Sequence, residues 1–168
     1  FSKNMDLRIE DFIKKAKSVD MIYLDSPNNP TGFQFSNKDL EKLIKSFSGP
    51  IIIDEAYGEF SNSSVLSLVK KYPNIILVKT LSKAFGLAGL RIGYMIADKK
   101  ITEVFSNVIQ YPYPLNTLAI ECGILAIEKS KQIIPIFEVI KKQRARIIKN
   151  LKKYDAFDVF DSNANFVL

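Results

Sequence analysis

The 168-residue chain contains no histidine. Catalytic systems in which a histidine activates a serine or a cysteine are therefore excluded within it. Zinc sites built from imidazoles and paired thiolates are excluded as well, because the chain has a single cysteine, Cys122. Lysine, tyrosine and carboxylates remain for acid–base or covalent chemistry, and lysine is the usual partner of an aldehyde cofactor.

With Cys122 as its only thiol, the chain cannot form an internal disulfide. A single cysteine fits a reducing compartment, and we expect a cytoplasmic protein. No run approaches the ~18 apolar residues of a membrane span, so no membrane partner is expected. The first residues, "FSKNMDLRIED", lack a secretory signal pattern and an initiator methionine, which suggests a fragment of a longer protein.

The chain carries a net charge of +6, and its C-terminal part is rich in lysine. Apolar residues between positions 133 and 151 recur at helical spacing, which predicts a long amphipathic helix. A nucleic-acid surface would usually add aromatic or arginine-rich interleaving. We therefore interpret the charge as a solvated outer face and expect no nucleic-acid partner. The basic residues concerned are Lys129, Lys131, Lys141, Lys142, Arg144, Arg146, Lys149, Lys152 and Lys153.

Short apolar strands and helices alternate along the chain. Ser36 is a favoured N-cap residue and Asp39 follows three positions later, which predicts the start of a helix. By apolar pattern, the predicted strands are residues 21–24, 50–57, 75–80, 91–97, 157–160 and 165–168. The predicted helices are residues 7–16, 36–47, 65–71, 117–128 and 133–154.

This alternation predicts an α/β fold with an open, mostly parallel sheet and helices on both faces. The strand at residues 91–97 is the expected exception. Its connection from Thr80 to Arg91 is too short for the helical crossover that a parallel neighbour needs. We therefore expect this strand to run antiparallel.

Polar groups follow three of the predicted strands, at Asn28–Gly32, Asp54–Tyr57 and Thr80–Lys83. In open α/β sheets the ligand lies beyond the carboxyl ends of the strands. The three segments are therefore expected to line one crevice.

The side chains of this crevice suit a phosphorylated pyridine aldehyde. Lys83 can bind the aldehyde covalently, and a buried Asp54 can keep the ring nitrogen protonated. The ordinary alternatives are that Lys83 is a surface charge and that Asp54 caps a helix.

The other groups of such a ligand also find partners. Its ring hydroxyl needs donors, which Asn29 and Tyr57 supply. Its phosphate needs hydroxyls and a guanidinium, which Thr80, Ser82 and Arg91 supply. The ordinary alternatives are a simple turn at Asn29 and core packing of Tyr57.

Three blocks carry a resemblance to a known family: "SPNNPTG", "DEAYGEF" and "TLSKAFGLAGLRIGY". They resemble the signature blocks of fold-type I pyridoxal-phosphate aminotransferases. Within these the chain is most similar to the histidinol-phosphate aminotransferases, as "YPYPLN" and "SNANFVL" also indicate. The resemblance implies catalytic roles for Lys83, Asp54 and Tyr57. It implies that the cofactor-binding residues are Asn29, Asp54, Tyr57, Thr80, Ser82, Lys83 and Arg91, with no metal.

The resemblance also implies an organisation and an activity. Residues 1–115 are expected to belong to the large cofactor-binding domain, and residues 116–168 to linking helices and the start of a small α+β domain. The expected reaction is transamination between an amino donor, such as histidinol phosphate, and a 2-oxo acid, in a homodimer. Relatives extend beyond both ends, so the fragment alone is expected to be incomplete for catalysis. The resemblance further suggests a cis peptide before Pro30.

Three alternatives stay open. A pyridoxal-phosphate decarboxylase of the same fold would use the same motifs with different substrate residues. An aminotransferase-like effector domain of a DNA-binding regulator would add a winged helix upstream. The chain could also be a folded module without catalytic activity.

Overall fold

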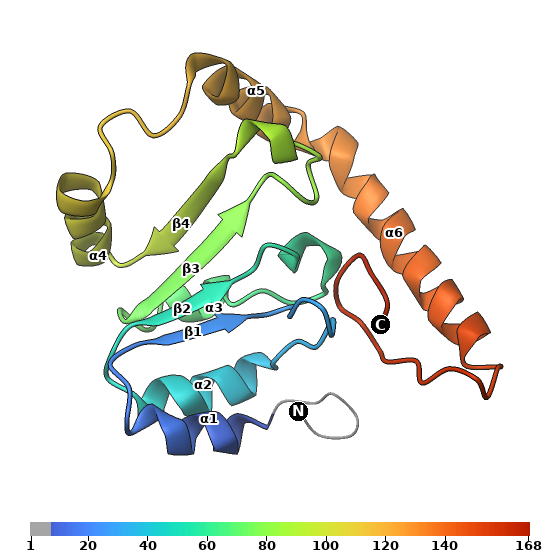
Figure 1. The fold of residues 1–168 in the computed structure, drawn as a ribbon. Coiled ribbons are helices and arrows are strands. Elements are labelled where there is room, and N and C mark those ends of the chain that lie inside the picture. Colours follow the sequence, from blue (N-terminus) through green and yellow to red (C-terminus); the bar gives the residue numbers. More distant parts are fainter. Residues whose placement is uncertain (1–7) are drawn as a thin grey trace.

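The computed structural model describes residues 8–168 and centres on a four-stranded sheet of order β1-β2-β3-β4 (Figure 1). Strands β1, β2 and β3 run parallel, and β4 runs antiparallel to β3. The strands are β1 (Ile22–Asp25), β2 (Ile51–Asp54), β3 (Ile75–Thr80) and β4 (Gly93–Ala97). Both the mixed sheet and the direction of β4 confirm the prediction.

Helices precede, separate and follow these strands. They are α1 (Ile9–Ala16), α2 (Asn37–Ser46), α3 (Leu66–Val69), α4 (Lys99–Val104), α5 (Thr117–Glu128) and α6 (Ser130–Leu151). Short turns of other helical types are η1 (Gly58–Phe60), η2 (Ala88–Leu90) and η3 (Phe105–Ile109). The predicted first helix began at Leu7, which lies outside the described residues. The sequence did not predict α4 or η3.

Helix α2 begins where the sequence predicts. The backbone N–H of Asp39 donates to the Ser36 hydroxyl at 3.1 Å, and that hydroxyl donates to the Asp39 carboxylate at 2.7 Å. The cap satisfies one of the backbone donors left free at a helix start, which typically stabilises a helix by about 1 kcal/mol.

One face of the sheet carries the main core. Alternate residues of the three parallel strands lie there, and α1, α2 and α3 pack over them. Each apolar side chain buried in this way typically contributes about 1.5–3 kcal/mol. The buried strand residues are Ile22, Leu24, Ile51, Ile53, Ile75 and Leu77.

The opposite face of the sheet is more open. Tyr23 is 57% exposed, and its partners in the register, Ile52 and Ile76, are only half-buried. Helix α4 and η3 stand beside this face and leave a hollow of about 970 Å³ over Ile52, Ile76 and Val78. Within the described residues, this face therefore has less helical cover than the first.

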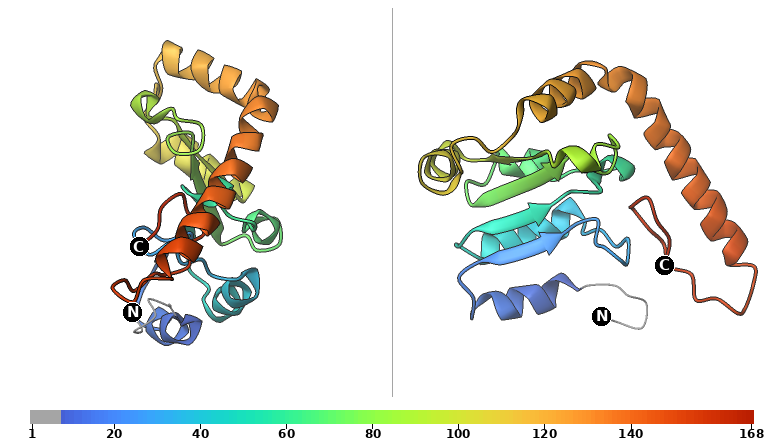
Figure 2. Two further views of the ribbon diagram at one scale, coloured as in Figure 1. Left: turned by 90° about the vertical axis from the view of Figure 1, so that its right-hand side faces the viewer. Right: turned by 45° about the horizontal axis from the view of Figure 1, so that its top comes forward.

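Helices α5 and α6 form an arm that passes around the sheet (Figure 2). The arrowheads of β1, β2 and β3 point toward α6, and the C-terminal segment turns back between α6 and the sheet (Figures 1 and 2). In α6 the predicted apolar stripe is buried at Phe137 alone, whereas Ile134 and Ile147 are exposed.

The strands predicted at residues 157–160 and 165–168 are wrong, because neither stretch is assigned as a strand. A single backbone hydrogen bond, from Phe160 N–H to the Leu168 carbonyl at 3.1 Å, joins the two stretches. A strand needs a continuous ladder to a neighbour. Backbone groups between the two stretches instead bond to Gly32 and to the side chain of Arg144.

Candidate active site

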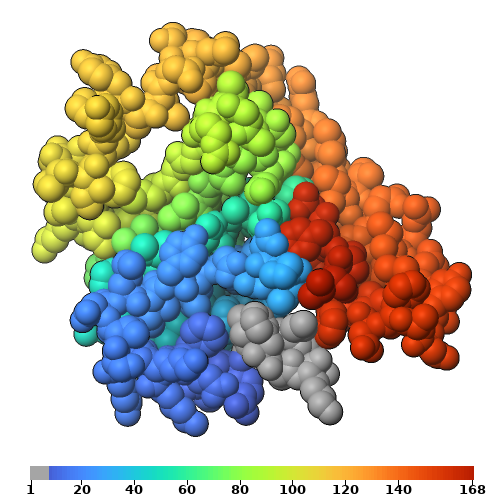
Figure 3. All heavy atoms as spheres, viewed as in Figure 1, coloured from blue at the N-terminus to red at the C-terminus, as the bar shows by residue number. Residues whose placement is uncertain are grey.

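The loops that follow β1, β2 and β3 meet at one edge of the sheet, as the sequence predicts. Asp25 and Asp54 are register partners at the ends of β1 and β2, and both lie on the more open face. Figure 3 shows the C-terminal segment lying against the loop that follows β1. The site is therefore bounded by three strand ends and by one segment from far along the chain.

Asp54 is held by two hydrogen bonds. The Tyr23 hydroxyl donates to Oδ2 at 2.5 Å, and the backbone N–H of Ala56 donates to Oδ1 at 2.8 Å. The hydrogen bond to Asp54 is the main reason that the pKa of Tyr23 is raised to about 12, with burial and the charges of Asp54 and Asp25 adding to it. The carboxylate thus has a fixed orientation at the strand end.

The sequence reasoning did not single out Tyr23. A signal for it existed in the predicted sheet, since Tyr23 precedes Asp25 by two residues and therefore shares its face. Its pairing with Ile52, two residues before Asp54, brings it within reach of the carboxylate.

Asn29 and Tyr57 lie together, as the resemblance implied. The Asn29 side-chain amide donates to the Tyr57 hydroxyl at 3.1 Å. Asp25 fixes the loop by accepting from the Asn28 amide at 2.8 Å and from the Asn29 backbone N–H at 3.1 Å. The peptide before Pro30 is cis, as expected.

Lys83 lies beside Tyr57. Its Nζ is 5.2 Å from the centre of the Tyr57 ring, and its side chain is exposed. The ring of Phe166 also packs against Tyr57, edge-on, with the ring centres 5.1 Å apart. An amine, a phenol and the Asn29 amide are therefore gathered at one point.

The residues assigned to a phosphate are only partly gathered. The Thr80 hydroxyl donates to the Ile92 carbonyl at 2.9 Å and accepts from the Ser82 backbone N–H at 3.0 Å, and it lies 2.9 Å from the Ser82 hydroxyl. Arg91 is exposed, has a left-handed backbone (φ 56°), and donates to the Ala88 carbonyl at 3.2 Å. The two hydroxyls thus form a pair, whereas the guanidinium bonds to the backbone of its own loop.

The C-terminal segment is a part of the site that sequence reasoning missed. Asn163 N–H donates to the Gly32 carbonyl at 2.8 Å, and Ala164 is fully buried. Arg144 of α6 donates to the carbonyls of Phe60 and Ala164, at 3.0 and 2.5 Å. In the sequence, the only indication of this segment's importance was the block "SNANFVL". That block supported the family resemblance but did not predict which residues the segment contacts.

The side chains present fit a phosphorylated pyridine aldehyde. Lys83 offers an accessible amine, Asp54 an oriented carboxylate for a ring nitrogen, and Asn29 a donor amide. Hydroxyls for a phosphate lie at Thr80 and Ser82. Among residues 8–168 there is no group of three or more His, Cys, Asp or Glu side chains placed to hold a metal ion. The same part of the chain has no helix that is long and apolar enough to span a bilayer.

The chain matches known proteins over nearly its whole length. Residues 2–168 match the family described as aminotransferase class I and II. Histidinol-phosphate aminotransferase of Buchnera aphidicola subsp. Schizaphis graminum is 41% identical over 168 residues, which cover 96% of this chain and 46% of that protein. The chain thus spans about half the length of the curated relatives it matches.

Solved structures share the fold. The histidinol-phosphate aminotransferase of Clostridium acetobutylicum superposes with a TM-score of 0.89 at 31% identity, covering 99% of this chain and 52% of that one. The enzyme of the same name from Sinorhizobium meliloti, solved in complex with pyridoxal-5'-phosphate, gives a TM-score of 0.84 at 24% identity. That match covers 95% of this chain and 45% of the other.

Proposed function

The chain belongs to the class I and II aminotransferase family, and from this premise we propose that it supplies the lysine-bearing part of a pyridoxal-phosphate-dependent aminotransferase. The proposed amino donor is an amino-alcohol phosphate such as histidinol phosphate, and the acceptor is a 2-oxo acid. Similarity to histidinol-phosphate aminotransferases across the chain supports this choice of donor.

The observation that carries the proposal is the position of Lys83. Its amine lies 5.2 Å from the ring centre of Tyr57, whose hydroxyl accepts from Asn29. A lysine that serves only as surface charge has no need of a phenol and an amide at the end of a parallel sheet, where ligands bind in such folds.

Each residue has a distinct task in this proposal. Lys83 would hold the cofactor by its aldehyde, and its Nζ, once freed by the donor, would take the proton from the α-carbon of the donor and deliver it to the carbon of the former aldehyde. Asp54 holds a proton on the ring nitrogen by charge pairing. Pyridoxal phosphate supplies the electron sink for the carbanion.

The remaining residues orient the cofactor. Asn29 and Tyr57 bind the ring hydroxyl, and Thr80 and Ser82 bind the phosphate by charge-assisted hydrogen bonds. Arg91 completes the phosphate site by exchanging the Ala88 carbonyl for the phosphate, because an anion is a stronger partner for a guanidinium than a neutral carbonyl.

We also propose a wider organisation. Residues 1–115 belong to the large cofactor-binding domain, and residues 116–168 provide the linking helices and the start of the small domain. The full-length protein is a homodimer in the cytoplasm. The family resemblance supports the domain division and the homodimer. The single cysteine supports the cytoplasmic location.

Borohydride reduction of the cofactor-loaded full-length protein, followed by peptide mapping, tests the assignment. The pyridoxyl group is expected on Lys83 and absent from a Lys83→Arg variant, which keeps the charge but lacks a nucleophilic amine. Recovery of the label on another lysine would overturn the assignment. Release of CO2 from the substrate, without consumption of a 2-oxo acid, would show a decarboxylase in place of an aminotransferase.

A further inference from the structure

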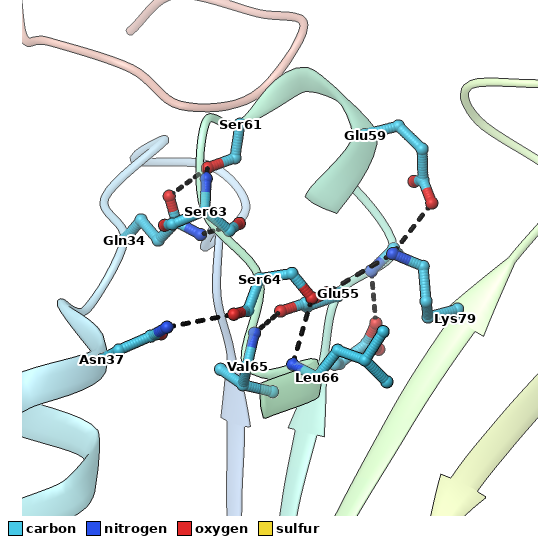
Figure 4. A network of polar contacts seen from close by, with 12 residues as sticks. Gln34, Asn37, Glu55, Glu59, Ser61, Ser63, Ser64, Val65, Leu66 and Lys79 are labelled. Atoms are coloured by element: carbon cyan, nitrogen blue, oxygen red, sulfur yellow. Dashed lines mark hydrogen bonds and ion pairs between the residues drawn. The ribbon is translucent and has the colours of Figure 1, made fainter. Parts of the chain in front are cut away.

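Lys79 lies between two glutamates, Glu55 and Glu59 (Figure 4). Its Nζ lies 2.8 Å from Oε1 of Glu59 and 3.3 Å from Oε2 of Glu55. The Lys79 side chain is 14% exposed and that of Glu55 is fully buried. Lysine and glutamate are almost never buried unless they are paired, so this arrangement needs a reason.

Glu55 has further partners that fix it in place. Its carboxylate accepts from the Ser64 hydroxyl at 2.8 Å and from the Val65 backbone N–H at 2.6 Å. Gly58 lies close to the ion pair. A Cβ at Gly58 would lie 3.0 Å from Glu55 Cβ and 3.3 Å from Lys79 Nζ, so a side chain at this position would crowd the pair.

The ion pair joins the ends of β2 and β3. Glu55 directly follows β2, and its backbone N–H donates to the Val78 carbonyl at 2.9 Å. Lys79 is the next residue of β3, on the same face as the buried Leu77. The side chains therefore bridge the two strand ends on the core face of the sheet.

Two residues of the candidate site are sequence neighbours of this ion pair, Asp54 beside Glu55 and Thr80 beside Lys79. Successive side chains of a strand point to opposite faces. Asp54 immediately precedes Glu55 and lies on the more open face, while Thr80 immediately follows Lys79 and lies on that same face. One face thus carries the ion pair, and the other carries the groups proposed for the ring nitrogen and the phosphate.

Lys79 stays charged in this setting. Burial alone would lower its pKa, but the hydrogen bond from Lys79 to Glu59 and the charges of Glu59 and Glu55 outweigh burial, so the pKa of Lys79 is raised. Removing one partner from a buried pair leaves a buried charge unsatisfied. The ion pair therefore adds a side-chain bridge to the backbone hydrogen bonds that already join the two strand ends.

We propose that Lys79, held by Glu55 and Glu59, is a positioning residue that acts together with the backbone hydrogen bonds between β2 and β3 to keep Asp54 and Thr80 in their relative positions. This inference rests on the proposed function. The distance between the ring nitrogen and the phosphate of the cofactor is set by its covalent structure. Asp54 and Thr80 can engage both groups at once only if the strand ends keep the matching separation.

The test compares two probes on the full-length protein, pyridoxal phosphate and pyridoxal, which lacks the phosphate. In Lys79→Met the affinity for pyridoxal phosphate is expected to fall about tenfold or more, and that for pyridoxal less than about threefold. Lys79→Arg keeps the charge and is expected to restore the ratio of the two affinities. The matched control is Lys71→Met, which breaks the exposed pair with Glu41 and should leave both affinities unchanged.

A triple variant separates positioning from folding. Lys79→Met with Glu55→Gln and Glu59→Gln removes all three charges, so its melting temperature should recover relative to Lys79→Met. The proposal requires that the phosphate-dependent affinity stays low. The proposal is overturned if the affinity for pyridoxal phosphate recovers together with the melting temperature. It is also overturned if Lys79→Met loses affinity equally for pyridoxal phosphate and for pyridoxal.

The proposed function fails in a different way. In that case the unmodified full-length protein would bind neither probe, which would overturn this inference as well. If the unmodified protein binds pyridoxal phosphate and Lys79→Met binds it equally well, the positioning role alone is overturned.

Discussion

The hydroxyl of Tyr23 on β1 donates to the carboxylate of Asp54 on β2 at 2.5 Å. The two residues lie on the same face of adjacent strands, because Tyr23 pairs with Ile52 and Asp54 follows Ile52 by two residues. Tyr23 is more than half exposed, so its hydrogen bond to Asp54 is at the surface of the sheet and open to a ligand. The orientation of Asp54 therefore depends on a residue outside all three sequence blocks.

This contact makes the titration of Tyr23 testable. Its pKa is raised from 10.0 to about 12, first through the hydrogen bond to Asp54. A raised pKa means that the contact stabilises the fold fully below pH 10 and that this contribution is lost as the pH rises through about 12. In Asp54→Asn the pKa of Tyr23 should fall toward its ordinary value.

Ultraviolet difference absorbance of tyrosinate measures this, with Tyr23→Phe identifying the Tyr23 contribution. Identical titration curves for the wild type and Asp54→Asn would contradict the assignment.

Replacement of Gly32 by alanine should destabilise the protein more than the same change at Gly86. Both glycines have left-handed backbones, with φ of 70° and 69°, and this alone costs an alanine about 1–2 kcal/mol. At Gly32 the new Cβ would also lie 2.8 Å from the Cα of Ser162, whereas at Gly86 nothing lies within 4 Å. Overpacking of this kind typically adds about 1–3 kcal/mol.

Urea unfolding of Gly32→Ala and Gly86→Ala measures the difference in the free energy of unfolding. Equal losses for the two variants would mean that the C-terminal segment does not pack on Gly32 in solution.

Arg144→Met should weaken the attachment of α6 and of the C-terminal segment. The change removes two charged hydrogen bonds to the carbonyls of Phe60 and Ala164, and one such bond is worth about 1.5–3 kcal/mol. Because Arg144 is only half-buried, we expect a total loss of about 2 kcal/mol in the free energy of unfolding. Arg146→Met is the matched control, since Arg146 is exposed, and its effect should stay within about 0.5 kcal/mol.

The measurement is chemical denaturation of both variants under one set of conditions. A loss for Arg146→Met as large as that for Arg144→Met would refute a specific role for the two carbonyl contacts.

Phe166→Ala should lower the affinity for pyridoxal phosphate. The ring of Phe166 packs edge-on against Tyr57 at 5.1 Å, and such a pair is worth about 0.5–1.5 kcal/mol beyond the area it buries. Loss of this support leaves Tyr57 less well placed for the ring hydroxyl, so the dissociation constant should rise about three- to tenfold.

Cofactor titration of the full-length protein gives the dissociation constant. Phe157→Ala, at an aromatic that is 58% exposed, is the control and should bind as the wild type does. An unchanged constant for Phe166→Ala would remove Phe166 from the site.

Local patterns predicted the fold well where the signal is continuous. Strand β3 and helix α5 have the predicted bounds. A short apolar run favours a strand for β3, and a longer, uninterrupted apolar segment favours a helix for α5. The proximity of Asn29, Tyr57 and Lys83 also follows from strand order, since the carboxyl ends of neighbouring strands meet at one edge.

Contacts between distant segments could not be predicted in this way. The hydrogen bond from Arg144 to the Ala164 carbonyl depends on the path of α6 past the sheet. No local sequence pattern determines that path. The strands expected at residues 157–160 and 165–168 fail for the same reason. Alternation of apolar residues favours an extended chain but does not supply a neighbouring strand.

The strands of the sheet are neighbours in the order in which they occur along the chain. Among these four strands, each can therefore join the edge of the sheet that the earlier ones have formed, because none of them lies between two earlier strands. The connection from β3 to β4 is the shortest of the three. Closing the shortest loop costs the least chain entropy, so we expect this hairpin to form early in folding. Changes at the register partners Lys79 and Tyr94 should then slow folding more than they speed unfolding.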